Sequence, residues 1–213
     1  MTIRVLLADD HALMREGLRA LLAASGNISV VGEVSDGRQA VRRACDLMPD
    51  VVVMDVAMPE LNGIEAAGLI RDQCPDTKVV MLSMHSSTEH IHRAFAAGAA
   101  GYVLKASASR EVIDAVQAVN AGQRYLSPAL REAMNAAPWG AARVGPLDSL
   151  STRERQVLQL VVEGKSSADI GRTVHLSPKT VDTYRSRLMK KLGVSDVPSL
   201  VKFALEHGIT PSA

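Results

Sequence analysis

The sequence predicts two domains of different fold class, an α/β domain with a parallel sheet followed by a small all-α domain. In residues 3–121, short β-branched segments alternate with longer segments that carry apolar residues at three- and four-residue spacing, as strands and amphipathic helices do. From Leu150 onward the apolar spacing is helical, and no strand candidate occurs. A length of 213 residues is enough for two ordinary domains.

The first domain is expected to consist of five strand-then-helix units. Because a helix follows each strand, the strands should be parallel and the helices should cover both faces of the sheet. The common strand order for five such units is 2-1-3-4-5. Helices are expected at residues 11–25, 36–48, 62–73, 87–98 and 108–122. The expected strands are Ile3–Ala8, Ile28–Val34, Val51–Asp55, Lys78–Ser83 and Gly101–Leu104.

A linker is expected where the strand-helix alternation stops. We place the first domain at residues 1–122, the linker at 123–146 and the second domain at 147–213. The linker contains one short helical segment, Pro128–Asn135. It ends in the small residues, glycines and prolines of Pro138–Pro146, which are typical of an interdomain connection.

The composition indicates a globular protein without a membrane segment. Residues are 47% hydrophobic and 22% charged, and apolar runs such as Val51–Met54 are far too short to cross a bilayer. Two acids occur by residue 10, which argues against a secretory signal and favours a cytoplasmic location. The two cysteines, Cys45 and Cys74, make neither a disulfide framework nor a metal motif. We expect them to be reduced and packed.

Positive charge is concentrated in the C-terminal part. Residues 146–213 carry ten Lys or Arg against seven Asp or Glu, whereas residues 1–145 carry fourteen against sixteen. The segment Ser177–Leu192 alone contains five basic residues and one acid. This asymmetry favours the second domain as the nucleic-acid-binding part, although many solvated helices have a similar charge.

Three carboxylates are expected to meet at one edge of the sheet. In a doubly wound sheet, ligands bind beyond the carboxyl ends of the strands where the strand order reverses, here between the first and third strands. The first strand leads into Asp9 and Asp10, and the third ends in Asp55. Clustered carboxylates repel one another unless a cation neutralises them, and such oxygen ligands suit Mg2+. An alternative for Asp10 alone is that it caps the following helix.

Two further strand ends suggest phosphate chemistry. The fourth strand ends in Ser83, whose hydroxyl can bond a phosphoryl oxygen, and Lys105 follows the fifth. Three acids, a hydroxyl and a lysine together predict a phosphoryl-handling site in which Asp55 is the nucleophile that becomes an aspartyl phosphate.

The segments "LLADDH", "VVVMDVAMPELNG", "VVMLSMH" and "AAGYVLK" resemble the receiver domain of two-component response regulators. The resemblance implies a flavodoxin-like (βα)5 fold and phosphorylation of Asp55 by a sensor histidine kinase. It also implies a Mg2+ site formed by Asp9, Asp10, Asp55 and the main-chain carbonyl of Ala57. Ser83 and Lys105 would bind the phosphoryl oxygens, and Tyr102 would report the switch.

The second domain carries the pattern of a helix-turn-helix. Ser151 or Thr152 is expected to cap its first helix together with Glu154. A short helix from Ser167 to about His175 precedes a basic helix, Pro178–Leu192, which Ser177 caps and Gly193 ends. Such a second helix can lie in the major groove of DNA. An ordinary helical bundle with a solvated basic face is the alternative.

The segments "LSTRE", "VVEGKSSADIG" and "LSPKTVDTYRSRLMKKLGV" resemble the LuxR-type DNA-binding domain of NarL/FixJ response regulators. Asp182 could accept a bond from cytosine or only weaken non-specific binding, and Thr180 could simply satisfy the helix start. The side chains placed for base edges are Asp182, Thr183 and Ser186, with Arg185 alongside. Those placed for phosphates are Lys179, Thr180, Tyr184, Arg187 and Lys190.

Together the two patterns predict a transcriptional regulator rather than an enzyme. Its expected partners are a sensor histidine kinase, double-stranded promoter DNA and a second copy of the chain when phosphorylated or DNA-bound. A phosphoaspartyl hydrolase is the rival from another class, but its second acid would stand two residues after the nucleophile, where this chain has Ala57. A protein- or RNA-binding output domain is a third alternative.

Overall fold

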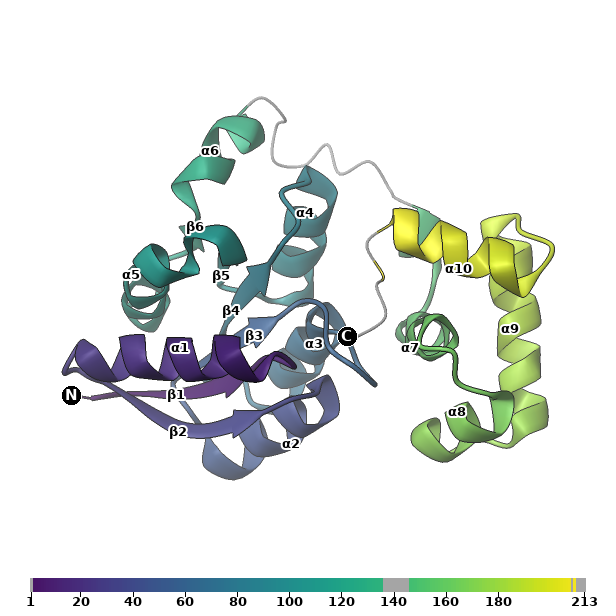
Figure 1. The fold of residues 1–213 in the computed structure, drawn as a ribbon, viewed down its shortest axis with the longest axis horizontal. Helices are drawn as coiled ribbons and strands as arrows, with labels where there is room; N and C mark the ends of the chain where they lie inside the picture. The colour runs from purple at the N-terminus through teal and green to yellow at the C-terminus, as the bar shows by residue number, and fades with distance from the viewer. Residues whose placement is uncertain (1, 136–145, 208, 210–213) are drawn as a thin grey trace. The chain divides into compact units, whose positions relative to one another are not determined.

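The computed structural model of the chain describes residues 2–135, 146–207 and 209. These residues form two compact units (Figure 1). The first contains all elements up to α6, and the second contains all elements from the short 3-10 helix η2 (Pro146–Ser149) onward. Most of the predicted linker segment Pro138–Pro146 lies outside the described residues, and the domain limits stay a prediction.

The first unit is a parallel sheet in the order β2-β1-β3-β4-β5-β6. The predicted fold class, with the order 2-1-3-4-5 for the first five strands, is confirmed. The strands are β1 (Ile3–Ala8), β2 (Ile28–Val34), β3 (Val51–Asp55), β4 (Lys78–Ser83), β5 (Gly101–Leu104) and β6 (Tyr125–Leu126). The helices are α1 (Ala12–Ala24), α2 (Gly37–Leu47), α3 (Gly63–Gln73), α4 (Thr88–Ala97), α5 (Ala108–Asn120) and α6 (Pro128–Asn135), with the 3-10 helix η1 at Lys105–Ser107.

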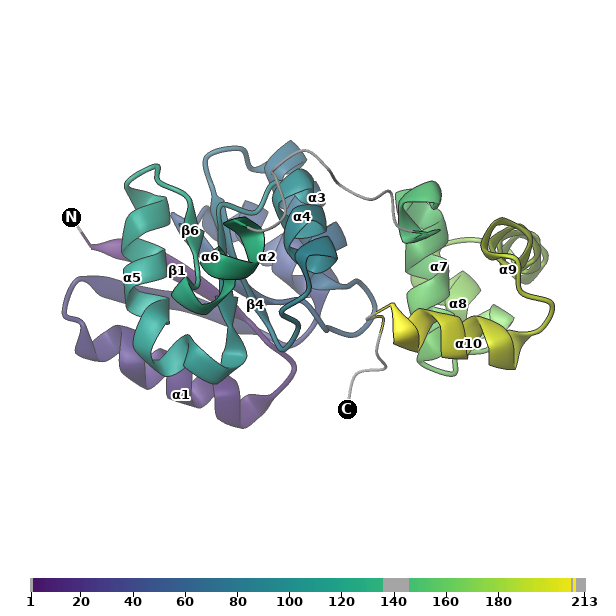
Figure 2. The same ribbon diagram turned by 90° about the horizontal axis from the view of Figure 1, so that it is seen from above.

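Helices cover both faces of this sheet (Figure 2). Helices α1 and α5 pack together on one face, where Leu18, Leu22 and Val116 join the inward side chains of the strands in one buried cluster. Helices α2, α3 and α4 follow one another on the other face. Every residue of β3 is buried, as expected for a central strand covered on both sides.

The sixth strand was not expected, and it lies in the predicted linker segment. Its two residues are too few to show a period in the sequence. Tertiary contacts hold it: the Tyr125 and Ser127 amides donate to the Ala100 and Tyr102 carbonyls, and the buried Ser127 hydroxyl accepts from the Leu104 amide at 3.1 Å. Residues 125–131 therefore extend the first unit.

The second unit is helical, with α7 (Thr152–Val162), α8 (Ser167–Val174), α9 (Pro178–Leu192) and α10 (Val197–Glu206). Ser151 and Glu154 form the expected capping box at the start of α7. Ser177 caps α9, and Gly193 ends it in the left-handed conformation. Apolar side chains from all four helices form one buried core. None of the described helices has the length and apolar character needed to cross a membrane.

The expectation of reduced, packed cysteines is wrong. Cys45 and Cys74 form a disulfide, with their Cα atoms 5.9 Å apart. Cys45 is exposed in the last turn of α2, and Cys74 is half-buried at the end of α3. The two helices are neighbours on the same face of the sheet, and that proximity does not show in a sequence separation of 29 residues.

Reduction of this disulfide is expected to lower the unfolding temperature of the chain. The bond closes a loop with a sequence separation of 29 residues, and the chain-entropy relation assigns such a loop about 3–4 kcal/mol. Thermal unfolding of oxidised and reduced protein measures the difference, with Cys45→Ser as the control that removes the redox dependence. Equal midpoints in the two redox states would contradict the expectation.

Candidate functional site

The sheet brings the predicted acids, hydroxyl and lysine to one edge. Register pairs Ala8 with Met54, Asp55 with Leu82 and Ser83 with Leu104. The carboxyl ends of four adjacent strands are therefore level, and the residues at those ends lie side by side. Asp9, Asp55 and Ser83 are each at most 2% exposed.

Lys105 connects two of the carboxylates. Its Nζ lies 2.6 Å from Asp55 Oδ2 and 2.9 Å from Asp9 Oδ2. The side chain of Lys105 is only 7% exposed. A buried charge without a partner is costly. The ion pairs of Lys105 with Asp55 and Asp9 offset that cost for all three side chains.

The pKa values of this cluster follow from burial and from the ion pairs. Burial, with a smaller contribution from the charge of Asp9, raises the pKa of Asp55 to about 6, although Lys105 acts in the opposite direction. Burial lowers the pKa of Lys105, but the attraction of Asp55 and Asp9 outweighs it and the net shift is upward. At neutral pH Asp55 is ionised and can act as a nucleophile.

Asp55 is expected to make the stability of the metal-free protein depend on pH. Its pKa is about 6 in the folded chain against 3.8 for the unperturbed group, so the folded state binds more protons between these values and stability falls as the pH rises. The expected loss is of the order of 3 kcal/mol from pH 4 to pH 7. Urea unfolding at each pH, compared with Asp55→Asn, isolates this contribution. A difference between the two proteins that stays constant with pH would contradict it.

The acidic cluster fits a magnesium ion. Ligand atoms of Asp9, Asp10, His11 and Asp55 all lie within 4.8 Å of one another. Asp9 Oδ2 and Asp10 Oδ1 are buried, and each faces a basic group, Lys105 and His11 respectively. Converging carboxylate oxygens are the ligands that Mg2+ prefers in proteins.

Asp10 is not the helix cap that the alternative interpretation suggested. The N-cap position of α1 is held by His11. The side chain of Asp10 lies 2.7 Å from His11 Nδ1 instead. For Ala57, the structure shows its amide donating to Asp55 Oδ1 at 3.3 Å, and the role of its carbonyl stays a prediction.

Ser83 and Tyr102 both face the loop after β4. The Ser83 hydroxyl accepts from the His85 amide at 2.9 Å, and the Tyr102 hydroxyl donates to the His85 carbonyl at 2.9 Å. Tyr102 is fully buried, and this burial raises its pKa to about 12. The phenol therefore stays protonated and remains a donor at physiological pH.

Two residues of this site were missed in the sequence. His11 belongs to the metal-ligand cluster, and its place directly after Asp10 could have indicated that. Gly63 lets the loop after β3 fold back onto that strand, because a Cβ atom there would lie 2.0 Å from the Asp55 carbonyl oxygen. The Gly63 amide donates to the Val56 carbonyl at 2.9 Å, so the close approach shapes the backbone around Asp55.

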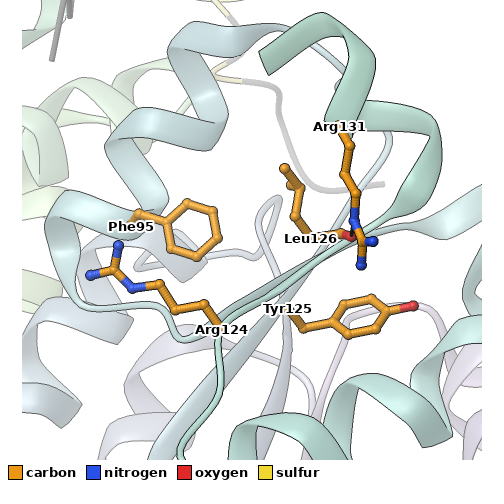
Figure 3. Close-up of a pocket in the computed structure, with 5 residues that line it drawn as sticks. All are labelled: Phe95, Arg124, Tyr125, Leu126 and Arg131. Carbon is orange, nitrogen blue, oxygen red and sulfur yellow. Dashed lines mark hydrogen bonds between the residues drawn. The ribbon is translucent and has the colours of Figure 1, made fainter. Parts of the chain in front are cut away.

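A separate pocket of about 290 Å³ lies on the first unit (Figure 3). The guanidinium of Arg124 lies 5.7 Å from the centre of the Phe95 ring, and Arg131 donates to the Leu126 carbonyl at 3.2 Å. Tyr125 completes the lining. The pocket has no acid or nucleophile and takes no part in the acidic site.

In the second unit, α8 and α9 form a helix-turn-helix. Their turn is tight because the Leu176 amide donates to the Gly171 carbonyl at 2.9 Å. A Cβ atom at Gly171 would lie 2.5 Å from the Leu176 carbonyl oxygen, so glycine is needed there. His175 ends α8 in the left-handed conformation. Val181 and Leu188 point into the core, which leaves the opposite face of α9 outside.

The residues predicted to contact DNA differ in their exposure. Tyr184 packs partly against the core, and Arg185 is half-buried. The Thr180 hydroxyl lies 2.8 Å from that of Ser177, and its alternative role of satisfying the helix backbone stays a prediction. The exposed members of the set are Lys179, Thr180, Asp182, Thr183, Ser186, Arg187 and Lys190.

Comparison with known proteins matches both units. Residues 5–117 match the family described as response regulator receiver domain, and residues 148–204 match the bacterial regulatory proteins of the luxR family. The chain is 39% identical to the transcriptional regulatory protein MctR of Rhizobium johnstonii and 38% identical to the response regulator UvrY of Escherichia coli K12, covering 97% of this chain and 95% of each relative. A crystal structure of a LuxR-family two-component response regulator from Aurantimonas sp. SI85-9A1 aligns with a TM-score of 0.60 at 38% identity, over 62% of this chain and 94% of that one.

Proposed function

Because this chain belongs to the response regulators that join a receiver domain to a LuxR-type DNA-binding domain, we propose that Asp55 is the phosphoacceptor that controls its binding to DNA. The chain is a DNA-binding transcriptional regulator of the two-component class. The observation that carries the proposal for Asp55 is its ion pair with Lys105 at the buried strand ends, 2.6 Å long. Asp9, the other carboxylate paired with Lys105, follows β1, whereas Asp55 is the last residue of β3.

The phosphoryl group would come from a histidine of a sensor kinase. A carboxylate oxygen of Asp55 attacks phosphorus, an O–P bond forms and the N–P bond of the phosphohistidine breaks. Lys105 and the Ser83 hydroxyl would bind the transferred oxygens. Asp9, Asp10, Asp55 and the Ala57 carbonyl would hold Mg2+, which neutralises charge on the transferred group when bound.

Phosphorylation would change the surroundings of β5. The phosphorylated side chain would carry a charge of about −1.5 to −2, in place of about −1 on the ionised Asp55 that Lys105 now contacts. Lys105 directly follows β5, and Tyr102 lies within it. A shift of the lysine toward the phosphoryl group would therefore act on the strand that carries the proposed switch tyrosine.

The output would be binding of α9 in the major groove of promoter DNA. Lys179, Arg187 and Lys190 are exposed on α9 and would bind phosphates, while Thr183 and Ser186 would face the base edges. A phosphorylated or DNA-bound homodimer would place two such helices on two half-sites. Binding to promoter DNA would take place in the cytoplasm.

The hydrolase alternative is disfavoured by Ala57. A methyl group stands where that chemistry would place its second acid, so we propose that the chain does not act as an enzyme on other substrates.

The test is a mobility-shift titration of promoter DNA with the full chain. Acetyl phosphate and Mg2+ are expected to increase the affinity, because the phosphoryl group shifts the population toward the DNA-binding state. Omitting either component should give the affinity of the untreated protein. Equal affinity under all conditions would overturn the proposal.

A further inference from the structure

A polar network joins the two helices of the helix-turn-helix at Ser167, the first residue of α8. The Ser167 hydroxyl donates a hydrogen bond of 2.6 Å to Asp182 Oδ1. Arg185 Nη1 donates a hydrogen bond of 2.9 Å to the same hydroxyl oxygen. Asp182 and Arg185 are three residues apart on α9, on one face of the helix, and both reach this one serine.

The network gives each member a defined orientation. A serine hydroxyl has one donor and two acceptor positions. Asp182 takes the donor, so the acceptor lone pairs are available to Arg185. The carboxylate of Asp182 therefore sets the direction of the hydroxyl, and the hydroxyl in turn holds the guanidinium.

If Arg185 is already held by Ser167 before DNA binds, recognition of a base costs less entropy. A free arginine side chain loses considerable rotamer entropy when a partner immobilises it. Arg185 is half-buried, whereas Ser186 and Arg187 beside it are exposed. A guanidinium has five N–H donors, and the bond to Ser167 uses one, which leaves donors for a base edge.

We propose that Ser167 and Asp182 are positioning residues that hold Arg185 for one guanine in the major groove, and so set sequence specificity without contacting a base. The proposal rests on the proposed DNA-binding function of α9. Bidentate bonding of arginine to guanine O6 and N7 needs a fixed guanidinium plane. Asp182 Oδ1 accepts from Ser167, which gives Asp182 a role beside the two considered from the sequence, and those two stay predictions.

The test measures base discrimination with the full chain. Wild-type protein first selects duplexes from a random DNA pool, and affinities are then measured for every single base-pair change in the selected site. Ser167→Ala is expected to lose about tenfold discrimination at one G·C pair. Its salt dependence should equal that of wild type, because no charge is removed. Ser195→Ala, which removes an exposed hydroxyl outside α8 and α9, is the matched control and should change nothing.

Conservative variants separate orientation from charge and from folding. Ser167→Thr and Asp182→Asn keep the hydroxyl and the acceptor oxygen, and both should retain the discrimination. Asp182→Ala should lose it at the same base pair. In an Arg185→Ala background, Ser167→Ala should have no further effect, because the serine acts through the arginine.

Three results would overturn the proposal. Ser167→Ala could keep the wild-type discrimination, or it could lower the affinity for every duplex by the same factor. It could also have the same effect in the Arg185→Ala background as in wild-type protein. If wild-type protein selects no sequence at all, the DNA-binding function fails first and the positioning role fails with it, so the two failures are distinguishable.

Discussion

An Asp55→Ala variant is expected to take up no phosphoryl group and to bind DNA equally well with and without acetyl phosphate. The methyl group has no nucleophilic oxygen, and it leaves Lys105 with Asp9 as its remaining partner in the cluster. In wild-type protein, acetyl phosphate should raise the DNA affinity roughly tenfold or more, which is in the range of typical allosteric coupling. Asp55→Ala should lose this increase. This is the largest effect that we expect from any single substitution.

Mass spectrometry of the intact protein measures phosphorylation, and mobility shift measures DNA affinity. Asp46→Ala is the matched control, because Asp46 is an exposed acid on α2 and its loss should leave both readouts unchanged. Phosphorylation of Asp55→Ala at the wild-type level would show that another residue is the phosphoacceptor. Loss of phosphorylation with a retained response to acetyl phosphate would show that the switch does not use Asp55.

Replacing Lys179 and Arg187 together by alanine is expected to weaken binding to every DNA sequence by a similar factor. Both side chains are exposed on α9 and would each neutralise one phosphate. The slope of log affinity against log salt concentration should fall by about 2, because each phosphate contact contributes about 0.9. The preference among DNA sequences should remain, because phosphate contacts do not read bases.

Affinity measured over a range of salt concentrations tests this expectation, for a selected duplex and for an unrelated one. Lys202→Ala is the control, since Lys202 is an exposed lysine on α10 and its removal deletes a charge outside α9. An unchanged slope in the double variant would show that α9 does not lie against the DNA backbone. A loss confined to one sequence would show that these residues read bases.

Much of the fold followed from local patterns. The bounds of β1 to β5 coincide with β-branched runs, because strands buried in a parallel sheet consist of such residues. Helix α9 begins and ends where Ser177, Pro178 and Gly193 predict, because caps act on the backbone of their own helix. The convergence of Asp9, Asp55 and Lys105 also followed, since level strand ends are a property of the parallel sheet.

Features that depend on contacts between residues far apart in the chain could not be predicted from the sequence. The disulfide between Cys45 and Cys74 needs α2 and α3 to be neighbours. Strand β6 exists because its backbone finds partners in β5. The link from Ser167 to Arg185 crosses from one helix to the next.

By itself, the sequence determined where the first five strands and most of the helices lie, which side chains end those strands, and that an acidic site and a basic helix occur in one chain. These are short-range consequences of backbone preference, apolar spacing and capping. Only the tertiary structure decided which groups touch: that Lys105 joins Asp55 to Asp9, and that Asp182 bonds Ser167. The physical reason is that hydrogen bonds and ion pairs act over a few ångströms, and packing alone brings residues from separate elements within that distance.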